Sequence, residues 1–122
     1  SKGRDYTIMI SDSLRAKHCP PGGDYELGGH PIEISDSGLA YLKGTKTIAG
    51  STLSMNRGLK VLVEDALIPF DAALNSCTIN PARCLGVDNR KGKLAAGHDA
   101  DLVVLEDNYE VCQTYCRGVK ML

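Results

Sequence analysis

The sequence predicts an α/β fold, and three patterns carry this prediction. The apolar run from Tyr6 to Ile10 is typical of a short strand buried on both faces, as in a parallel sheet. Residues 50–68 predict a helix. Its apolar stripe comprises Met55, Leu59, Leu62, Val63 and Ala66. Residues 102–120 contain an apolar run and then two alternating runs, with turn signals between them, and predict strands.

The segment between these patterns predicts a hairpin. Pro and Gly at 20–23 break the preceding structure. Two strand-like runs then flank Ser35 to Gly38, and the pair Gly28-Gly29 indicates a tight backbone position. The small residues at 47–51, "TIAGS", are expected at the entrance of the first long helix.

Two shorter helices are expected before the final strands. The first covers 69–78, and its first residue, Pro69, ends the preceding helix. Its expected buried residues are Phe70, Ala73, Leu74 and Cys77. The second has Asn80 as N-cap, Pro81 at the first helical position and Gly86 just past the end. A strand at 102–105 follows, and then two strands joined by a turn at 117–118.

Composition excludes several classes of partner. The 122 residues carry a net charge of −1, so nothing draws the chain to nucleic acid or to acidic membranes. No apolar run approaches the roughly 18 residues that span a bilayer. The five cysteines are odd in number and irregularly spaced, which argues against a disulfide framework. Reduced thiols and a cytoplasmic location are therefore expected.

Asp12 is the first candidate functional residue, because it follows the apolar run directly. One interpretation is an N-cap, with Asp12 or Ser13 opening a turn over "LRAK". The other is a carboxylate at the carboxyl end of a parallel strand, where the catalytic groups of α/β barrels lie. Such a group can take a proton from a metal-bound water and return it to a leaving amine.

Other polar groups carry weaker signals. Open backbone N–H groups at "TIAGS" would suit a ligand, and an ordinary helix entrance explains the segment equally well. "HDAD" at 98–101 predicts a tight turn whose acids accept backbone N–H groups. His18, His30 and His98 lack metal-site spacing, as do the cysteines, so no metal site is expected from this chain alone.

Longer motifs add a resemblance. "TINPARCLGVDNRKGKLAAGHDADLVVLE" (78–106) resembles the closing segment of the amidohydrolase superfamily, with its T-x-x-P-A-x-x-L-G and G-x-L-x-x-G-x-D-A-D-L-V patterns. "ISDSLRAKHCPPGGDYELGGHPIEI" and "TIAGSTLSMNRGLKVLVE" resemble the N-acetylglucosamine-6-phosphate deacetylases within it. The likeness covers essentially the whole chain and implies the C-terminal third of such an enzyme.

The resemblance implies roles for a few residues. Asp12 matches the catalytic aspartate after the eighth strand of a metal-dependent (β/α)8 barrel, which moves a proton from water to the glucosamine nitrogen. Ile48, Ala49 and Gly50 match the segment that contacts the sugar phosphate. Ser11 and Ser13 depart from the usual Thr and Ala. The family's metal ligands (zinc or iron class) and an arginine from the partner subunit of a homodimer are absent from this chain.

These implications define the expected architecture. Residues 1–86 would form the last part of the barrel, with a hairpin insertion at about 24–47, and residues 87–122 would form strands of a small β-sandwich. The isolated chain is expected to be inactive and, because apolar faces would be exposed, to self-associate. The alternatives are another amidohydrolase, dihydroorotase-like or deaminase-like, and a non-catalytic assembly domain.

Overall fold

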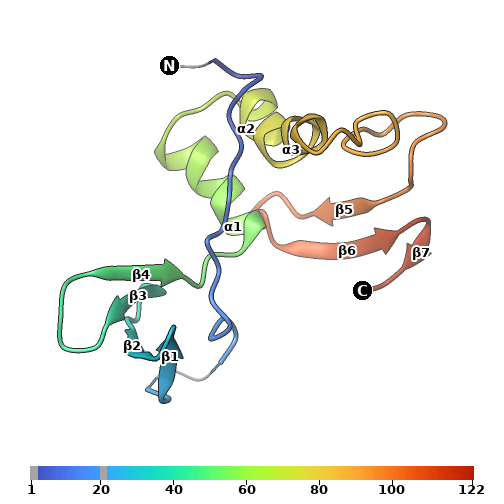
Figure 1. Cartoon of the computed structure of the whole chain (residues 1–122). Coiled ribbons are helices and arrows are strands. Elements are labelled where there is room, and N and C mark those ends of the chain that lie inside the picture. Colours follow the sequence, from blue (N-terminus) through green and yellow to red (C-terminus); the bar gives the residue numbers. More distant parts are fainter. Residues whose placement is uncertain (1–2, 20–21) are drawn as a thin grey trace. The chain divides into compact units, whose positions relative to one another are not determined.

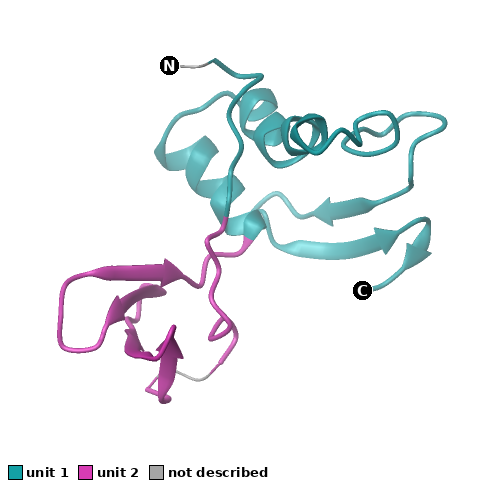
Figure 2. Cartoon of the chain, viewed as in Figure 1, with its two compact units in different colours: residues 1–10, 55–122 teal, residues 11–54 magenta. Residues whose placement is uncertain are grey.

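The computed structural model describes residues 3–19 and 22–122, and the chain divides into two units (Figure 2). Unit 1 comprises residues 1–10 and 55–122, and unit 2 comprises residues 11–54. Each unit has its own β-sheet (Figure 1). The predicted break at 20–23 falls partly on residues outside the described part.

Unit 2 is built on an antiparallel sheet in the order β1-β2-β3-β4. The strands are β1 Tyr25–Leu27, β2 His30–Ile34, β3 Leu39–Leu42 and β4 Ile48–Ser51. The predicted hairpin over Ser35 to Gly38 is confirmed, because it joins β2 to β3. Gly28 and Gly29 join β1 to β2 with φ of 57° and 81°, a left-handed pair that glycine adopts without strain.

The core of unit 2 is small and aliphatic. Ile32, Ala40 and Ala49 are buried together, one from each of β2, β3 and β4. Partly buried apolar side chains pack around them: Leu14, Tyr25, Ile34 and Leu42. Leu14 therefore packs against the core of the sheet.

The expected helix entrance at 47–51 is wrong, because Ile48–Ser51 form strand β4. This strand pairs with β3, with Leu39 opposite Ser51 and Tyr41 opposite Ile48. The open edge of β3 supplies hydrogen-bonding partners that local sequence does not reveal. The helix begins only at Met55.

The first helix of unit 1 changes pitch midway. Helix α1 (Met55–Lys60) continues as a π-helical segment, η1 (Val61–Asp65), where Ala66 N–H donates to Val61 C=O at 2.9 Å. Leu59 is buried, but Met55 and Ala66, both of the predicted stripe, are exposed. The wider π turn rotates the later side chains off the 3.6-residue stripe.

Helix α2 (Phe70–Cys77) confirms the second predicted helix but not all of its buried face. Ala73 and Ser76 are buried, whereas Phe70 is 52% exposed and Leu74 is also exposed. Large apolar side chains here have no covering element in the described part of the chain, so periodicity alone misassigned them.

Helix α3 (Ile79–Cys84) begins before the predicted N-cap. Thr78 occupies the cap position, so Asn80 as N-cap is wrong. Asn80 is instead buried inside the helix and donates from its side-chain amide to Arg4 C=O at 2.7 Å and Thr7 C=O at 2.8 Å. Gly86 follows the helix with φ of 67°, as predicted.

The predicted strand from Tyr6 to Ile10 is wrong, since these residues have no strand assignment. Met9 N–H donates to Ser76 C=O at 3.1 Å, but no ladder of such bonds follows. Tyr6 is 78% exposed and Ile10 71% exposed. A strand requires a neighbouring strand with which it forms a ladder of hydrogen bonds, and none pairs with this run in the described part of unit 1.

The final strands of unit 1 form an antiparallel sheet, β5-β6-β7. They are β5 Leu102–Leu105, β6 Val111–Cys116 and β7 Val119–Lys120. The bounds of β5 match the prediction, and the turn at Arg117 and Gly118 is confirmed, with φ of 48° and 79°.

No helix among the described residues is long and apolar enough to cross a bilayer.

Candidate functional site

Asp12 lies in an irregular segment of unit 2 and its side chain is exposed. A turn follows, in which Lys17 N–H donates to Leu14 C=O at 3.1 Å and Cys19 N–H to Ala16 C=O at 3.0 Å. The predicted turn over 14–17 is therefore confirmed, but no helix follows it and, among the described residues, neither Asp12 nor Ser13 accepts a backbone N–H through its side chain, so neither residue is an N-cap. The backbone of Asp12 has φ of 46°, the left-handed region that non-glycine residues adopt rarely.

Strand β4 lies directly beside Asp12. Ser13 and Ser51 form a parallel bridge, in which Ser51 N–H donates to Asp12 C=O at 2.9 Å and Leu14 N–H donates to Ser51 C=O at 2.8 Å. The structure thus brings together the two segments that sequence analysis singled out separately. Within the described residues the Asp12 carboxylate accepts no hydrogen bond and forms no ion pair, so its oxygens are available to a ligand.

Gly50 permits this close approach. Its φ is 86°, and a Cβ built there would lie 2.8 Å from Leu14 Cδ2 and 3.3 Å from Asp12 O. Any side chain would push the two segments apart while also straining the backbone. A glycine is therefore required at this position if Asp12 is to stay against β4.

The other two candidate binding residues differ in what they present. Ile48 is 62% exposed, so its side chain can contact a ligand. Ala49 belongs to the core of unit 2, so it can contact a ligand only through its backbone. The three residues therefore offer one apolar side chain and a stretch of main chain rather than a cluster of charges.

A groove of about 290 Å³ borders the same segment of unit 2. It is lined by Leu14, Arg15, Ala16, Cys19, Asp24, Tyr25, Glu26, Leu27 and Ile32. Burial raises the pKa of Tyr25, and the Cys19 thiol adds to this, so the phenol stays protonated at neutral pH. Among the groups that line the groove, Arg15 is a cation.

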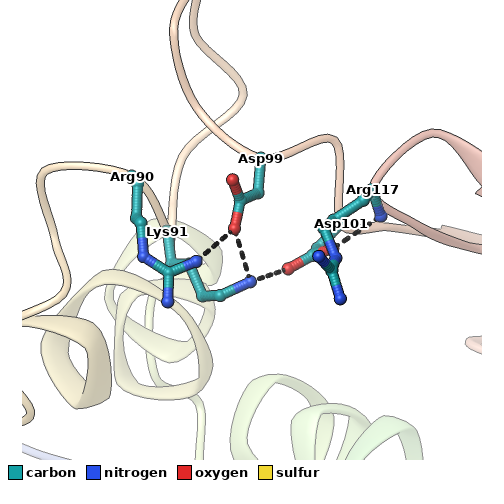
Figure 3. A network of polar contacts seen from close by, with 5 residues as sticks. All are labelled: Arg90, Lys91, Asp99, Asp101 and Arg117. Carbon is teal, nitrogen blue, oxygen red and sulfur yellow. Dashed lines mark hydrogen bonds and ion pairs between the residues drawn. The ribbon is translucent and has the colours of Figure 1, made fainter.

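The "HDAD" segment of unit 1 forms an ion network rather than a simple turn (Figure 3). Lys91 lies between Asp99, at 2.8 Å, and Asp101, and Arg90 pairs with Asp99 at 2.6 Å. Asp101 also accepts the backbone N–H of Arg117 at 2.9 Å, as predicted for an acid of this segment. The network joins the loop after α3 to the turn between β6 and β7.

These contacts shift the pKa values of the three central groups. Hydrogen bonds from Lys91 lower the pKa of Asp99 and of Asp101, with the Arg117 N–H as the second cause at Asp101. The two aspartates in turn raise the pKa of Lys91, Asp101 most strongly. All three groups are charged at neutral pH, which suits ion pairs that stabilise the fold and does not suit proton transfer.

The histidines do not assemble a metal site in the described part of the chain. His18 and His30 are exposed, and both ring nitrogens of His98 are buried without a hydrogen-bond partner among the described residues. No group of three or more His, Cys, Asp or Glu side chains within residues 3–19 and 22–122 could hold a metal ion. Sequence analysis assigned no role to Ser51, which bonds to the Asp12 segment, although the residue belongs to "TIAGS".

Comparison with known proteins gives a family match over most of the chain. Residues 28–121 match the model described as the amidohydrolase family. N-acetylglucosamine-6-phosphate deacetylase of Bacillus subtilis is 38% identical over 118 residues, which are 97% of this chain and 29% of that protein. The human protein of the same name is 33% identical over 111 residues, 91% of this chain and 27% of its own length.

Solved structures show the same likeness. The N-acetylglucosamine-6-phosphate deacetylase from Pasteurella multocida superimposes with a TM-score of 0.88 at 25% identity, covering 96% of this chain and 30% of that one. A variant from Mycobacterium smegmatis, in complex with N-acetyl-D-glucosamine-6-phosphate, gives 0.85 at 34% identity, covering 97% and 31%. The chain thus spans less than a third of the length of these relatives.

Proposed function

Because the chain belongs to the amidohydrolase family, we propose that it contributes the Asp12 segment of an N-acetylglucosamine-6-phosphate deacetylase. The reaction hydrolyses N-acetylglucosamine 6-phosphate to glucosamine 6-phosphate and acetate. One observation carries the proposal: Asp12 and the segment Ile48–Ser51 lie side by side, with Asp12 C=O bonded to Ser51 N–H at 2.9 Å. The adjacency supports the proposal that Asp12 transfers a proton beside a main-chain segment that binds the substrate.

In this proposal Asp12 moves the proton. Water attacks the acetyl carbonyl and loses a proton to the Asp12 carboxylate, which then delivers it to the nitrogen as the C–N bond breaks. The carboxylate is suited to this because it is exposed and its oxygens are unpaired within the described residues. Ile48, Ala49 and Gly50 would hold the sugar phosphate, Ile48 by its side chain and the other two by their backbone.

A divalent metal, of the zinc or iron class, is part of the proposal for the whole enzyme, where it would polarise the carbonyl and acidify the water. The described residues of this chain do not fit such an ion, because they contain no group of three ligating side chains close enough together. The proposal therefore assigns this chain proton transfer and substrate contact, and not metal binding.

The remaining parts concern organisation. We expect residues 1–86 to belong to a (β/α)8 barrel and residues 87–122 to a small β-sandwich. We also expect a homodimer and a small-molecule sugar phosphate as the ligand. The five cysteines of the described part are all unpaired, which is the state expected in the cytoplasm.

A chimera tests the function. The segment of the Bacillus subtilis relative that matches this chain is replaced by the 122 residues, and acetate release is measured with N-acetylglucosamine 6-phosphate. We expect turnover with this substrate and much less with N-acetylglucosamine or dihydroorotate. The chain alone, with added zinc, should give none.

The controls decide how a negative result is read. Circular dichroism and metal analysis establish that the chimera is folded and loaded. A folded, metal-loaded chimera that releases no acetate would refute the proposal, and so would equal activity toward dihydroorotate. Turnover by the chain alone would contradict the assignment of metal binding to residues outside it.

A further inference from the structure

Ser51 contacts the Asp12 segment through its side chain as well as through its backbone. Besides the two backbone bonds of the parallel bridge, its hydroxyl donates to Ser11 C=O at 2.5 Å. The same oxygen accepts the N–H of Leu53 at 3.0 Å. The hydroxyl is partly buried, so both its donor and its acceptor capacity are used inside the protein.

Ser51 forms hydrogen bonds to the backbone of Asp12 and to the backbone on either side of it. It donates to the carbonyls of Ser11 and Asp12, and its own carbonyl accepts the N–H of Leu14. Asp12 is held with φ of 46°, a conformation that costs roughly 1 to 2 kcal/mol for an L-residue. A neighbouring structure must hold such a residue, because an unrestrained segment would relax to an extended conformation.

We propose that Ser51 is a positioning residue for Asp12: its hydroxyl bond to Ser11 C=O fixes the backbone that directs the Asp12 carboxylate. The inference rests on the proposed role of Asp12 in proton transfer. The two backbone bonds would form with any residue at position 51, whereas the hydroxyl bond requires Ser or Thr. Replacement by Ala leaves Ser11 C=O and Leu53 N–H without this partner, and Thr preserves the hydroxyl.

The neighbouring residue provides a matched control. Thr52 lies next to Ser51 in unit 2 and also donates its hydroxyl to a backbone carbonyl, that of Gly38, at 2.9 Å. Thr52→Val removes a hydroxyl bond of the same kind away from Asp12. A purely structural role for position 51 would make Ser51→Ala and Thr52→Val behave alike.

The first measurement is amide hydrogen exchange by NMR on the 122-residue chain. Ser51→Ala should speed amide exchange at Leu14 by about threefold to tenfold, which corresponds to the stabilisation lost with one hydrogen bond. The same variant should change the backbone coupling constant of Asp12. Ser51→Thr should restore both values, and Thr52→Val should leave them as they are. Unchanged exchange at Leu14 in Ser51→Ala would overturn the inference without reference to activity.

The second measurement uses the chimera. Ser51→Ala should lower kcat by about tenfold or more, leave KM for the sugar phosphate within twofold, and be rescued by Ser51→Thr. If Asp12→Asn abolishes turnover while Ser51→Ala keeps full kcat, the positioning role of Ser51 is refuted and the proposed function stands. If Asp12→Asn leaves turnover intact, the proposed function fails, and the positioning role fails with it.

Discussion

The side-chain amide of Asn80 donates a hydrogen bond to the backbone carbonyl of Thr7 at 2.8 Å, so helix α3 holds the irregular N-terminal segment of unit 1. The same amide bonds Arg4 C=O at 2.7 Å, and the residue is only 2% exposed. An unpaired segment that sequence analysis assigned to a strand is thus held by a side chain. The two bonds satisfy the amide N–H donors of this buried residue, whereas its Oδ1 has no hydrogen-bond partner among the described residues.

Asn80→Ala should destabilise the chain by roughly 1 to 3 kcal/mol, because two backbone carbonyls lose a buried donor. The measurement is the free energy of unfolding from urea titration. Asn89→Ala, at an exposed position, is the control and should stay within about 0.5 kcal/mol of the parent. Equal effects of the two substitutions would show that the Asn80 amide bonds contribute nothing.

Gly50→Ala should destabilise unit 2 more than Gly44→Ala. Both glycines have positive φ, 86° and 74°, so both substitutions carry a backbone penalty of about 1 kcal/mol or more. Only at Gly50 would the new Cβ meet Leu14, at 2.8 Å, since nothing lies within 4 Å at Gly44. Urea unfolding of the two variants isolates the crowding, and a Gly44 variant as unstable as the Gly50 variant would disprove it.

Acid should weaken the network around Lys91. The pKa values of Asp99 and Asp101 are lowered in the folded chain, so their contribution is present above the unfolded-state pKa and is lost as pH falls through the folded-state values. The pKa of Lys91 is raised, so its contribution is present below its unfolded-state pKa and is lost only in strong alkali. The network should therefore be fully formed near neutral pH.

Lys91→Met tests this pH dependence. Its melting temperature should lie below that of the parent at neutral pH, and the difference should shrink as the pH falls through the range in which the two aspartates are protonated. Lys93→Met, at an exposed lysine, is the control. A difference that stays constant from neutral to strongly acidic pH would mean that these carboxylates do not stabilise the fold.

Cys112 should react slowly with alkylating reagents because of Glu106. The Glu106 carboxylate raises the pKa of the exposed Cys112 thiol, so less of this thiol is thiolate at neutral pH. Glu106→Gln should therefore speed alkylation of Cys112, measured by mass spectrometry of peptides. Cys116, exposed on the same strand, serves as the internal control. Equal acceleration at both thiols would point to a general loosening of β6.

The success of sequence analysis depended on whether an element is determined locally. Strand β5 was predicted to its end residues because its continuous apolar run and flanking turns lie within a few positions. The run at 6–10 failed because a strand also needs a distant partner. Strand β4 was missed for the same reason, since β3 decides its conformation.

The candidate site shows the same division. Local patterns left both a cap and a catalytic carboxylate open at Asp12, and the resemblance to a family favoured the catalytic role. The bond between Asp12 and Ser51 joins segments far apart in the sequence, so no local pattern could predict it. The positive φ of Gly50 was likewise not predicted, because its cause is the approach of Leu14 from the other segment.

The most direct test of the proposed function is Asp12→Asn in the chimera, with Asp36→Asn as control. Asp36 is an exposed carboxylate in the turn between β2 and β3 of the same unit. With folding and metal content matched, Asp12→Asn should lower kcat for N-acetylglucosamine 6-phosphate by roughly 10² to 10⁴, the contribution of a general acid and base. Asp36→Asn should retain the parent rate. A kcat for Asp12→Asn within twofold of the parent chimera would contradict a proton-transfer role for Asp12.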